Sequence, residues 1–263
     1  MWPILRTGDH GAEIGNWQRF LNDQECVDWN ARAITIDETF GPRTAYATKQ
    51  WQTRHQLPPT GVVESVERVK AREVSATLNT LGFIPFMQAA HCNVLYPKAR
   101  TIDVITIHTM ESSEKPGTAG AVARWFAGST APMASAHFCI DPNDVIQCVR
   151  ETDVAWHAPG CNHNGIGIEH AGYARQTAID WADEDSLKIL LNSAKLITKL
   201  LKRYSIPLVR LTSDNLKSGG RGLCGHVDAT IAFPGPGRTH TDPGEAFPWL
   251  YFLDLISQLQ RVG

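Results

Sequence analysis

The chain has 263 residues, of which 43% are hydrophobic and 20% charged, a composition typical of a globular protein with ample material for a core. The formal net charge of −2 argues against a nucleic-acid partner, since such proteins usually carry a basic patch or a high pI. No apolar run approaches the roughly 20 residues of a membrane-spanning helix, and no secretory signal pattern is visible. We therefore expect synthesis in the cytoplasm without membrane insertion. The six cysteines include no CxxC pair, so reduced thiols are expected.

The first part of the chain is predicted to form a small all-α domain. Apolar side chains at helical spacing, and a Gly-Pro step that suits a helix entry, predict helices over residues 11–23, 41–57 and 63–74. Three such helices make a domain of residues 1–72. Residues 73–85 are expected to connect it to the next domain.

From residue 86 onward, alternating strands and helices predict one α/β domain over residues 86–263. Short β-branched or Gly-flanked segments predict strands at residues 103–109, 135–141, 144–150 and 165–172. Helices are predicted at residues 118–128 and 183–207, the latter with acidic residues at its start and basic residues near its end. Its apolar stripe, expected to face the core, comprises Leu187, Leu190, Leu191, Ala194, Ile197 and Leu201.

Residues 224–249 are rich in Gly and Pro, so most of this segment is expected to be loop. It contains His226 and Asp242, which have no obvious structural purpose in a loop. His108 ends the predicted strand 103–109 and offers a third ligand. A His/His/Asp set leaves one coordination position open, which is the arrangement of a catalytic zinc ion. The pattern predicts one Zn²⁺ held by His108, His226 and Asp242.

Six motifs strengthen this interpretation: "VITIHT", "SAHFCID", "AWHAPG", "NGIGIEHAG", "GHVD" and "THTDPGEAFPW" occur in that order. Together they resemble the zinc-dependent N-acetylmuramoyl-L-alanine amidases of phage and bacteria. The resemblance implies a central mixed β-sheet flanked by helices, with His108, His226 and Asp242 as the metal ligands. It also implies that Glu169 is the acidic catalytic residue, acting as general base and then passing the proton to the leaving amine.

His240 departs from the pattern of the family, because many relatives carry a Lys two residues before the closing Asp. In an extended segment His240 and Asp242 face the same side. An imidazole there could stabilise the oxyanion of the tetrahedral intermediate. In the competing interpretation His240 is the metal ligand and Asp242 only orients it, and the resemblance favours Asp242.

The resemblance also implies a substrate groove. Its lining would contact the muramyl sugar or the stem peptide, although packing is an equally good explanation for any one member. The residues concerned are His137, Trp156, His157 and Asn164.

The segments "LRTGDHGAEIGNWQRFLN", "IDETFGPRTAYATKQWQTRHQL" and "PPTGVV" resemble the three-helix peptidoglycan-binding module of cell-wall hydrolases. The most specific part of this match is a signature formed by Asp37, Phe40, Gly41 and Thr44. The resemblance implies that these residues belong to a wall-binding module. The alternative is that they only make turns and core.

Both resemblances together imply a modular enzyme that binds bacterial peptidoglycan and cuts the amide between N-acetylmuramic acid and L-alanine. They suggest a monomeric phage endolysin, made in the host cytoplasm and reaching the wall when a holin perforates the membrane. A prophage-derived or bacterial autolysin is the alternative origin. The alternative functions are a non-catalytic peptidoglycan-recognition protein and a zinc peptidase acting on the stem peptide, although no HExxH helix is present.

Overall fold

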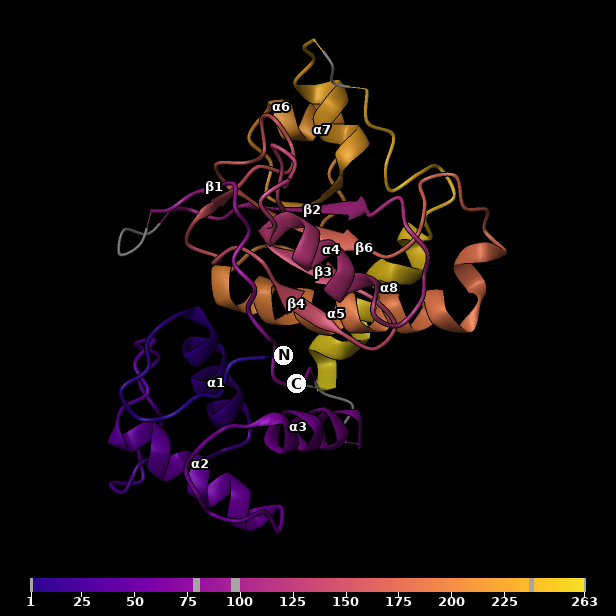
Figure 1. Cartoon of the computed structure of the whole chain (residues 1–263). Coiled ribbons are helices and arrows are strands. Elements are labelled where there is room, and N and C mark those ends of the chain that lie inside the picture. Colours follow the sequence, from indigo (N-terminus) through magenta and orange to yellow (C-terminus); the bar gives the residue numbers. More distant parts are fainter. Residues whose placement is uncertain (1, 78–80, 96–99, 237–238, 263) are drawn as a thin grey trace. The chain divides into compact units, whose positions relative to one another are not determined.

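The computed structural model describes residues 2–77, 81–95, 100–236 and 239–262. The chain divides into two compact units, residues 1–86 and 87–263 (Figure 1). None of the helices in the described part of the chain combines the length and the apolar character that crossing a bilayer requires.

The N-terminal unit is helical, as predicted. It contains α1 (Ala12–Asp23), α2 (Pro42–Arg54) and α3 (Ser65–Thr77). Aromatic side chains form its core: Trp17 packs edge-on against Trp51 with ring centroids 5.5 Å apart, and Phe20 contacts both rings. All three side chains are buried, so this unit has a core of its own.

Two buried glutamines hold the connections between these helices. The Gln18 amide donates to Asp37 Oδ1 at 2.8 Å, and its oxygen accepts from the backbone N–H of Asp37. Gln52 similarly donates to the carbonyl of Val62 at 2.8 Å and accepts from the N–H of Gly61. Each glutamine satisfies backbone groups of a turn that would otherwise lose hydrogen bonds on burial.

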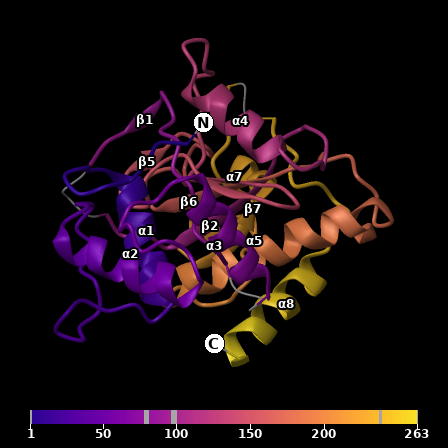
Figure 2. The same cartoon turned by 60° about the horizontal axis from the view of Figure 1, so that its bottom comes forward.

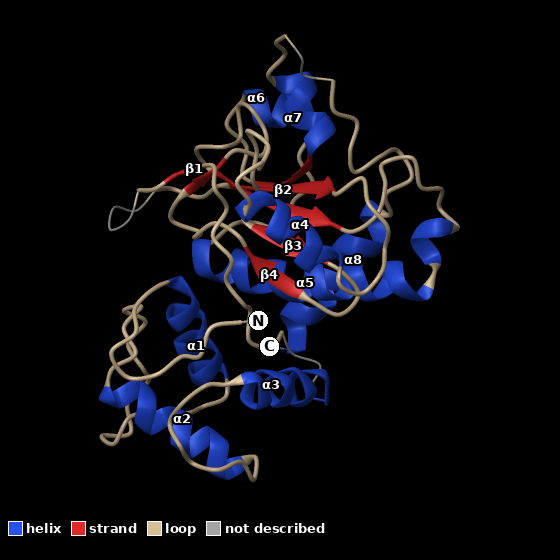
Figure 3. Cartoon of the chain, viewed as in Figure 1, coloured by secondary structure: helices blue, strands red, loops and turns tan. Residues whose placement is uncertain are grey.

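The C-terminal unit is built on a five-stranded mixed sheet (Figure 3). Its spatial order is β4 (Val145–Gln147), β3 (Phe138–Ile140), β6 (Gly165–His170), β2 (Val104–Thr109) and β7 (Gly222–Gly225). Only the β3–β4 pair is antiparallel. A second, two-stranded sheet pairs β1 (Cys92–Asn93) with β5 (Val154–Ala155).

Helices cover the sheet on both faces. Helix α4 (Thr118–Ala127) lies on one face, and α5 (Glu184–Tyr204) with α8 (Trp249–Val262) lies on the other (Figures 1 and 2). The shorter elements are η1 (Asp180–Ala182), α6 (Ser213–Lys217) and α7 (His226–Ala232). The central strands are buried, as expected for parallel strands covered by helices. The predicted fold class, an all-α module followed by a mixed sheet with flanking helices, is confirmed.

Several local expectations need correction. Most described residues of the Gly- and Pro-rich segment 224–249 form loop, as predicted, but the segment also contains the short helix α7, which was not predicted. Leu187, assigned to the core-facing stripe of α5, is 39% exposed. Helix α3 continues to Thr77, so the expected connector 73–85 begins inside a helix, and residues 78–80 lie outside the described residues.

Candidate active site

The strand register brings His108 and His226 together. Strands β2 and β7 are parallel, with Ile107 opposite Gly225, so the next residue of each chain segment lies at the same edge of the sheet. His108 is still part of β2, whereas His226 is the first residue of α7. Because the carboxyl ends of parallel strands meet at one edge, this is where α/β folds place their sites.

Asp242 joins this edge from a loop. Its carbonyl accepts a hydrogen bond from the N–H of Val227 at 2.9 Å, which fixes the loop against the start of α7. This approach of the Asp242 loop to α7 requires glycine directly before the helix, because a Cβ on Gly225 would lie 2.7 Å from the ring of Pro243. The backbone around both positions therefore sets the distance between His226 and Asp242.

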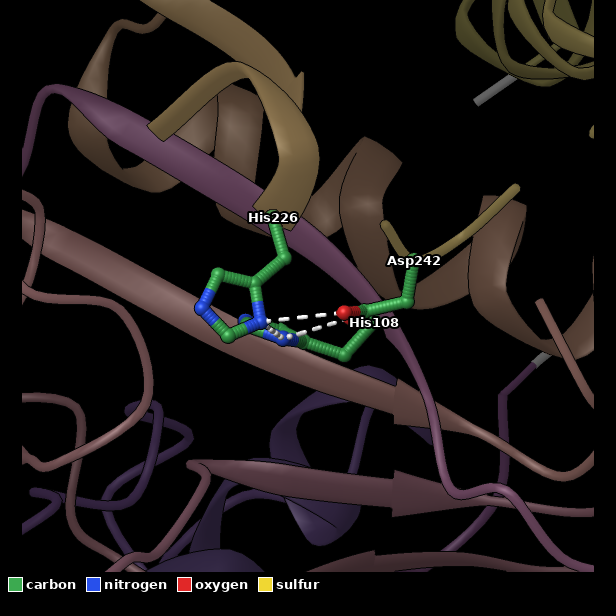
Figure 4. Close-up of side chains that lie close together, drawn as sticks. All are labelled: His108, His226 and Asp242. Atoms are coloured by element: carbon green, nitrogen blue, oxygen red, sulfur yellow. Dashed lines mark hydrogen bonds and ion pairs between the residues drawn. The ribbon is translucent and has the colours of Figure 1, made fainter. Parts of the chain in front are cut away.

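The three side chains converge on one point (Figure 4). His108 Nδ1 lies 3.1 Å from His226 Nδ1 and 3.2 Å from Asp242 Oδ2, and His226 Nδ1 lies 3.2 Å from Asp242 Oδ1. All three residues are buried. A tetrahedral zinc ion with bonds of about 2.0–2.2 Å holds its ligand atoms about 3.3–3.5 Å apart. The donor set and its spacing therefore fit a metal ion of this kind.

The protonation states also suit a cation. Burial raises the pKa of Asp242, but hydrogen bonds with His108 and His226 outweigh it and lower the pKa overall, so the carboxylate stays ionised. Burial lowers the pKa of His108, which favours the neutral imidazole. Metal ligands must be deprotonated, and these two groups meet that requirement without a cost at neutral pH.

His157 holds the opposite side of the His108 ring. Its Nδ1 lies 3.1 Å from His108 Nε2, while His108 Nδ1 faces the other two ligands. Asn162 fixes this loop, because its side-chain oxygen accepts from the N–H of His157 at 2.9 Å. A hydrogen bond on the far nitrogen of a ligating imidazole fixes its tautomer and orientation. His157 is therefore placed as a positioning residue for His108.

Glu169 lies beside His108 on the neighbouring strand. The two are direct register partners in the parallel pair β2–β6. Within the described residues, Glu169 Oε2 is a buried atom with no hydrogen-bond partner. Burial, together with the charge of Asp242, raises the pKa of this carboxyl well above its usual range. A carboxyl group with a strongly raised pKa next to three metal-type donors is a candidate general acid or base.

His240 lies outside the cluster of three donors. Its ring stacks on His226 with centroids 3.9 Å apart, and its Nδ1 lies 3.7 Å from Asp242 Oδ1. The side chain is 53% exposed, in contrast to the buried ligand candidates. This placement favours Asp242 as the third donor and leaves His240 at the mouth of the site.

Residues 98–245, more than half of the chain, match the model of the family described as N-acetylmuramoyl-L-alanine amidase. The chain belongs to this amidase family. Residues 10–66 match the model of a peptidoglycan binding domain, so the amidase carries a wall-binding module at its N-terminal end. Its activity is hydrolysis of an amide bond in peptidoglycan.

The chain is similar to one curated amidase in sequence and to several solved structures in fold. The N-acetylmuramoyl-L-alanine amidase A of Achromobacter lyticus is 30% identical over 166 residues, which cover 58% of this chain and 82% of that protein. The crystal structure of the Staphylococcus aureus hydrolase AmiA in complex with its ligand is 15% identical, with a TM-score of 0.50 over 76% of this chain and 92% of that one. A mutant endolysin from Bacillus subtilis is 22% identical, with a TM-score of 0.46 over 66% and 97%.

The four residues predicted to line the substrate groove of the amidase differ in their burial and in their contacts. His137 is fully buried, and its Nδ1 accepts from the N–H of Gly167 at 3.0 Å. The carbonyl of Asn164 accepts from the N–H of Asp103 at 2.9 Å, at the start of β2. The ring of His157 contacts His108. The contact of Asn164 uses its backbone alone, and this residue is partly exposed, so its substrate role stays a prediction.

Trp156 is the member of this set with a partly exposed ring. Its indole N–H donates to Asn93 Oδ1, and the ring stacks on His91 with centroids 5.7 Å apart. Trp156 therefore remains, with Asn164, a candidate for contact with a sugar or a peptide.

Two of the four signature residues of the wall-binding module, Phe40 and Thr44, are buried, whereas Asp37 is exposed. Phe40 is fully buried, Thr44 is 2% exposed, and Gly41 caps the start of α2. The carboxylate of Asp37 accepts from the Gln18 amide and from the N–H of Thr39. The structure places these four residues where they shape the module.

Two functional positions were missed by sequence reasoning. Asp228 accepts from the N–H of Gly225 at 2.7 Å and pairs with Arg210 at 2.7 Å, which anchors the first turn of α7 and with it His226. His170 lies within 3.0 Å of the carbonyl of His108 through its Nδ1, supporting the ligand strand. The "GHVD" motif contains Asp228, so its spacing from His226 was the available signal.

Proposed function

We propose that this amidase is zinc-dependent and cuts the bond between N-acetylmuramic acid and L-alanine. The observation that carries the proposal is the buried cluster of His108, His226 and Asp242 with Glu169 as register neighbour of His108. When bound, zinc supplies Lewis acidity at the scissile carbonyl and makes a nearby water more acidic.

The residues of the chain would divide the remaining work. Glu169 would take the proton of the attacking water as a carboxylate, the form that a bound cation beside it favours. It would then return that proton to the departing amine, a step that burial of the carboxyl favours because burial raises its pKa. His157 keeps the His108 ring in place. His240, at the exposed mouth, donates an N–H to the oxyanion that develops on the carbonyl.

Digestion of purified peptidoglycan tests the bond specificity. We expect mass spectrometry to find free stem peptides that begin at L-alanine, a loss of product with a chelator, and recovery with Zn²⁺. Fragments with a new amino terminus inside the stem would support a peptidase instead. Wall binding without any released amine would support a non-catalytic recognition protein.

His240→Ala separates the two interpretations of that residue. We expect the bound zinc to be retained while kcat falls about 100-fold, the loss typical of a removed oxyanion donor. Zinc content and turnover are measured on the same preparation. Loss of the metal would instead reassign His240 as a ligand.

We also propose that the enzyme acts as a phage endolysin, made in the host cytoplasm as a monomer and admitted to the wall by a holin. The support is the combination of a wall-binding module with an amidase domain. Expression in a bacterial host should cause lysis only when a holin is co-expressed. Lysis without a holin would contradict this route.

A further inference from the structure

The wall-binding module needs a contact surface that its signature residues do not provide. Phe40 is 0% and Thr44 2% exposed, so neither side chain can touch a polymer. Asp37 lies at the surface, and its Oδ1 accepts from the Gln18 amide and from the N–H of Thr39. The signature therefore offers the wall little beyond one carboxylate, and a larger contact surface needs side chains outside it.

An aromatic pair lies on the surface of the same module. Trp29, in the loop after α1, is 51% exposed, and Tyr46, on α2, is 40% exposed. Their ring centroids are 6.0 Å apart and the rings are nearly perpendicular, at 86°. Because large aromatic rings gain free energy on burial, two adjacent exposed rings mark an interaction site.

The loop that presents Trp29 is held rigidly. Asp28 is 2% exposed, and its Oδ1 accepts from the N–H of Asn30 at 2.8 Å and of Arg32 at 3.0 Å. Ala31 adopts a φ of 56°, a left-handed conformation that is costly for a residue with a Cβ. A strained but well-bonded turn fixes the ring before any ligand arrives, which lowers the entropy cost of binding.

Arg43 completes the platform. Its guanidinium lies over the Trp29 ring, 5.6 Å from the ring centre, and 3.7 Å from Asp28 Oδ2, so it supports one face of the indole. The Arg43 side chain is 53% exposed and keeps hydrogen-bond donors for a ligand. Trp29, Tyr46 and Arg43 form a surface with apolar rings and a cationic edge, which we call the aromatic platform.

We propose that the aromatic platform binds the glycan strand of peptidoglycan, a chain of β-1,4-linked N-acetylhexosamines. The rings of such sugars carry axial C–H groups that pack flat on an aromatic face. Arg43 can donate to an acetamido oxygen or to the carboxylate of a neighbouring stem. This inference rests on the wall-binding role and adds its ligand and residues.

A second copy of the chain fits the aromatic platform less well than a sugar does. The two half-exposed rings offer about 200 Å² between them, judged from the 150–250 Å² of a whole aromatic side chain. A stable protein interface buries about 1,200–2,000 Å². The platform therefore has the size of a sugar subsite.

Sedimentation of the full chain with purified cell-wall sacculi tests the platform. Glu169→Gln is used as the parent so that the wall stays intact. Trp29→Ala and Tyr46→Ala should each weaken binding about tenfold, as expected for an aromatic anchor. Trp29→Phe, which keeps a ring, should bind within about threefold of the parent. Tyr251→Ala, which removes a tyrosine of similar exposure (48%) on α8, is the matched control and should bind like the parent.

The ligand class is tested in the same assay with a soluble hexamer of β-1,4-linked N-acetylglucosamine. We expect this oligosaccharide to compete with sacculi for the parent. Competition by free stem peptide alone would overturn the glycan assignment. A parent that does not bind sacculi would refute the wall-binding role itself. Normal binding by both alanine variants, with folding verified by circular dichroism, would overturn only the platform.

Discussion

Burial and hydrogen bonds together set the charge states of the individual side chains at the site. Burial lowers the pKa of His108 and raises that of Glu169, so both groups favour their neutral form. Asp242 is held ionised because its hydrogen bonds with His108 and His226 outweigh its burial. A neutral imidazole beside an ionised carboxylate is what a divalent cation requires.

Glu169→Gln should lower kcat on a soluble muropeptide about 100-fold or more, because an amide cannot take up and return the proton. Bound zinc should be unchanged, since Glu169 is not one of the three clustered donors. Kinetics and metal analysis of one preparation measure both. A variant that loses its metal would show that this carboxylate holds the ion.

His137 should make the catalytic unit sensitive to acid. Burial, followed by the charge of Arg100, lowers its pKa to about 3, whereas an unfolded histidine titrates near 6.5. The unfolded chain therefore binds one more proton than the folded chain between these pH values, and stability falls as the pH drops through this window.

The expected slope from this residue is about 1.4 kcal/mol per pH unit between pH 6 and 4. Urea unfolding of the native chain and of His137→Asn, at several pH values, measures it. In the variant, the free energy of unfolding should depend less steeply on pH, by the amount that corresponds to about one proton. Equal slopes would mean that His137 is protonated in the folded state.

The candidate ligands could be named from sequence, because His108 ends an apolar strand and His226 and Asp242 stand in a loop-like segment that has no other use for them. The structural roles of His157 and Asp228 could not be predicted from the sequence. His157 meets His108 and Asp228 meets Arg210 through the tertiary fold, and a single chain without its fold carries no distance between such pairs.

At the scale of secondary-structure elements, strand β6 supports the site because one of its residues, Gly167, has no side chain. A Cβ on Gly167 would lie 2.5 Å from Cγ of His157, so the close approach of that ring requires glycine. The carbonyl of the same glycine accepts from the N–H of His137, and its N–H donates to the side-chain Nδ1 of His137. The strand thereby sets the position of the His157 ring, which contacts the candidate ligand His108.

Gly167→Ala should displace His157. We expect zinc affinity to fall about tenfold or more and the free energy of unfolding to fall by about 1–3 kcal/mol. Chelator competition and urea unfolding measure the two effects. Gly120→Ala is the matched control, because its Cβ would meet the far end of the Arg124 side chain at 3.3 Å and Ile146 Cδ1 at an ordinary contact distance of 3.7 Å. Unaltered zinc affinity in Gly167→Ala would argue against a positioning role for His157.

Helix α7 shows why one element escaped sequence-based prediction. Its seven residues lie in a segment whose Gly and Pro content indicates loop. The helix is stabilised locally by Asp228, which satisfies the N–H of Gly225, and by the ion pair with Arg210. Long amphipathic helices such as α5 are easier to predict, although Leu187 shows that the width of the buried face is set by what packs against it.

At the scale of the whole molecule, the two units have separate cores. The aromatic cluster around Trp17 and Trp51 belongs to the first, and the covered sheet with His108 belongs to the second. All three candidate ligands lie within residues 87–263. Any free energy gained from metal binding should therefore stabilise the second unit.

Removal of the metal should lower the melting temperature of the catalytic unit by about 5–10 °C, from the roughly 2.7 kcal/mol that a ligand at a hundredfold excess over its Kd provides. The transition of the wall-binding module should stay in place. Calorimetry of the full chain with and without a chelator measures both transitions. A downward shift of the module transition would mean that the metal is held elsewhere or that the units unfold together.

The backbone hydrogen bond from Val227 to Asp242 ties together the two ends of the segment between His226 and Asp242. This hydrogen bond joins the two ends of the chain segment between the candidate ligands. Doubling the length of a flexible loop costs only about 0.6 kcal/mol, so a change in the length of this segment should have little effect on the free energy of unfolding. Insertions between α7 and Asp242 should therefore leave the spacing of His226 and Asp242 unchanged.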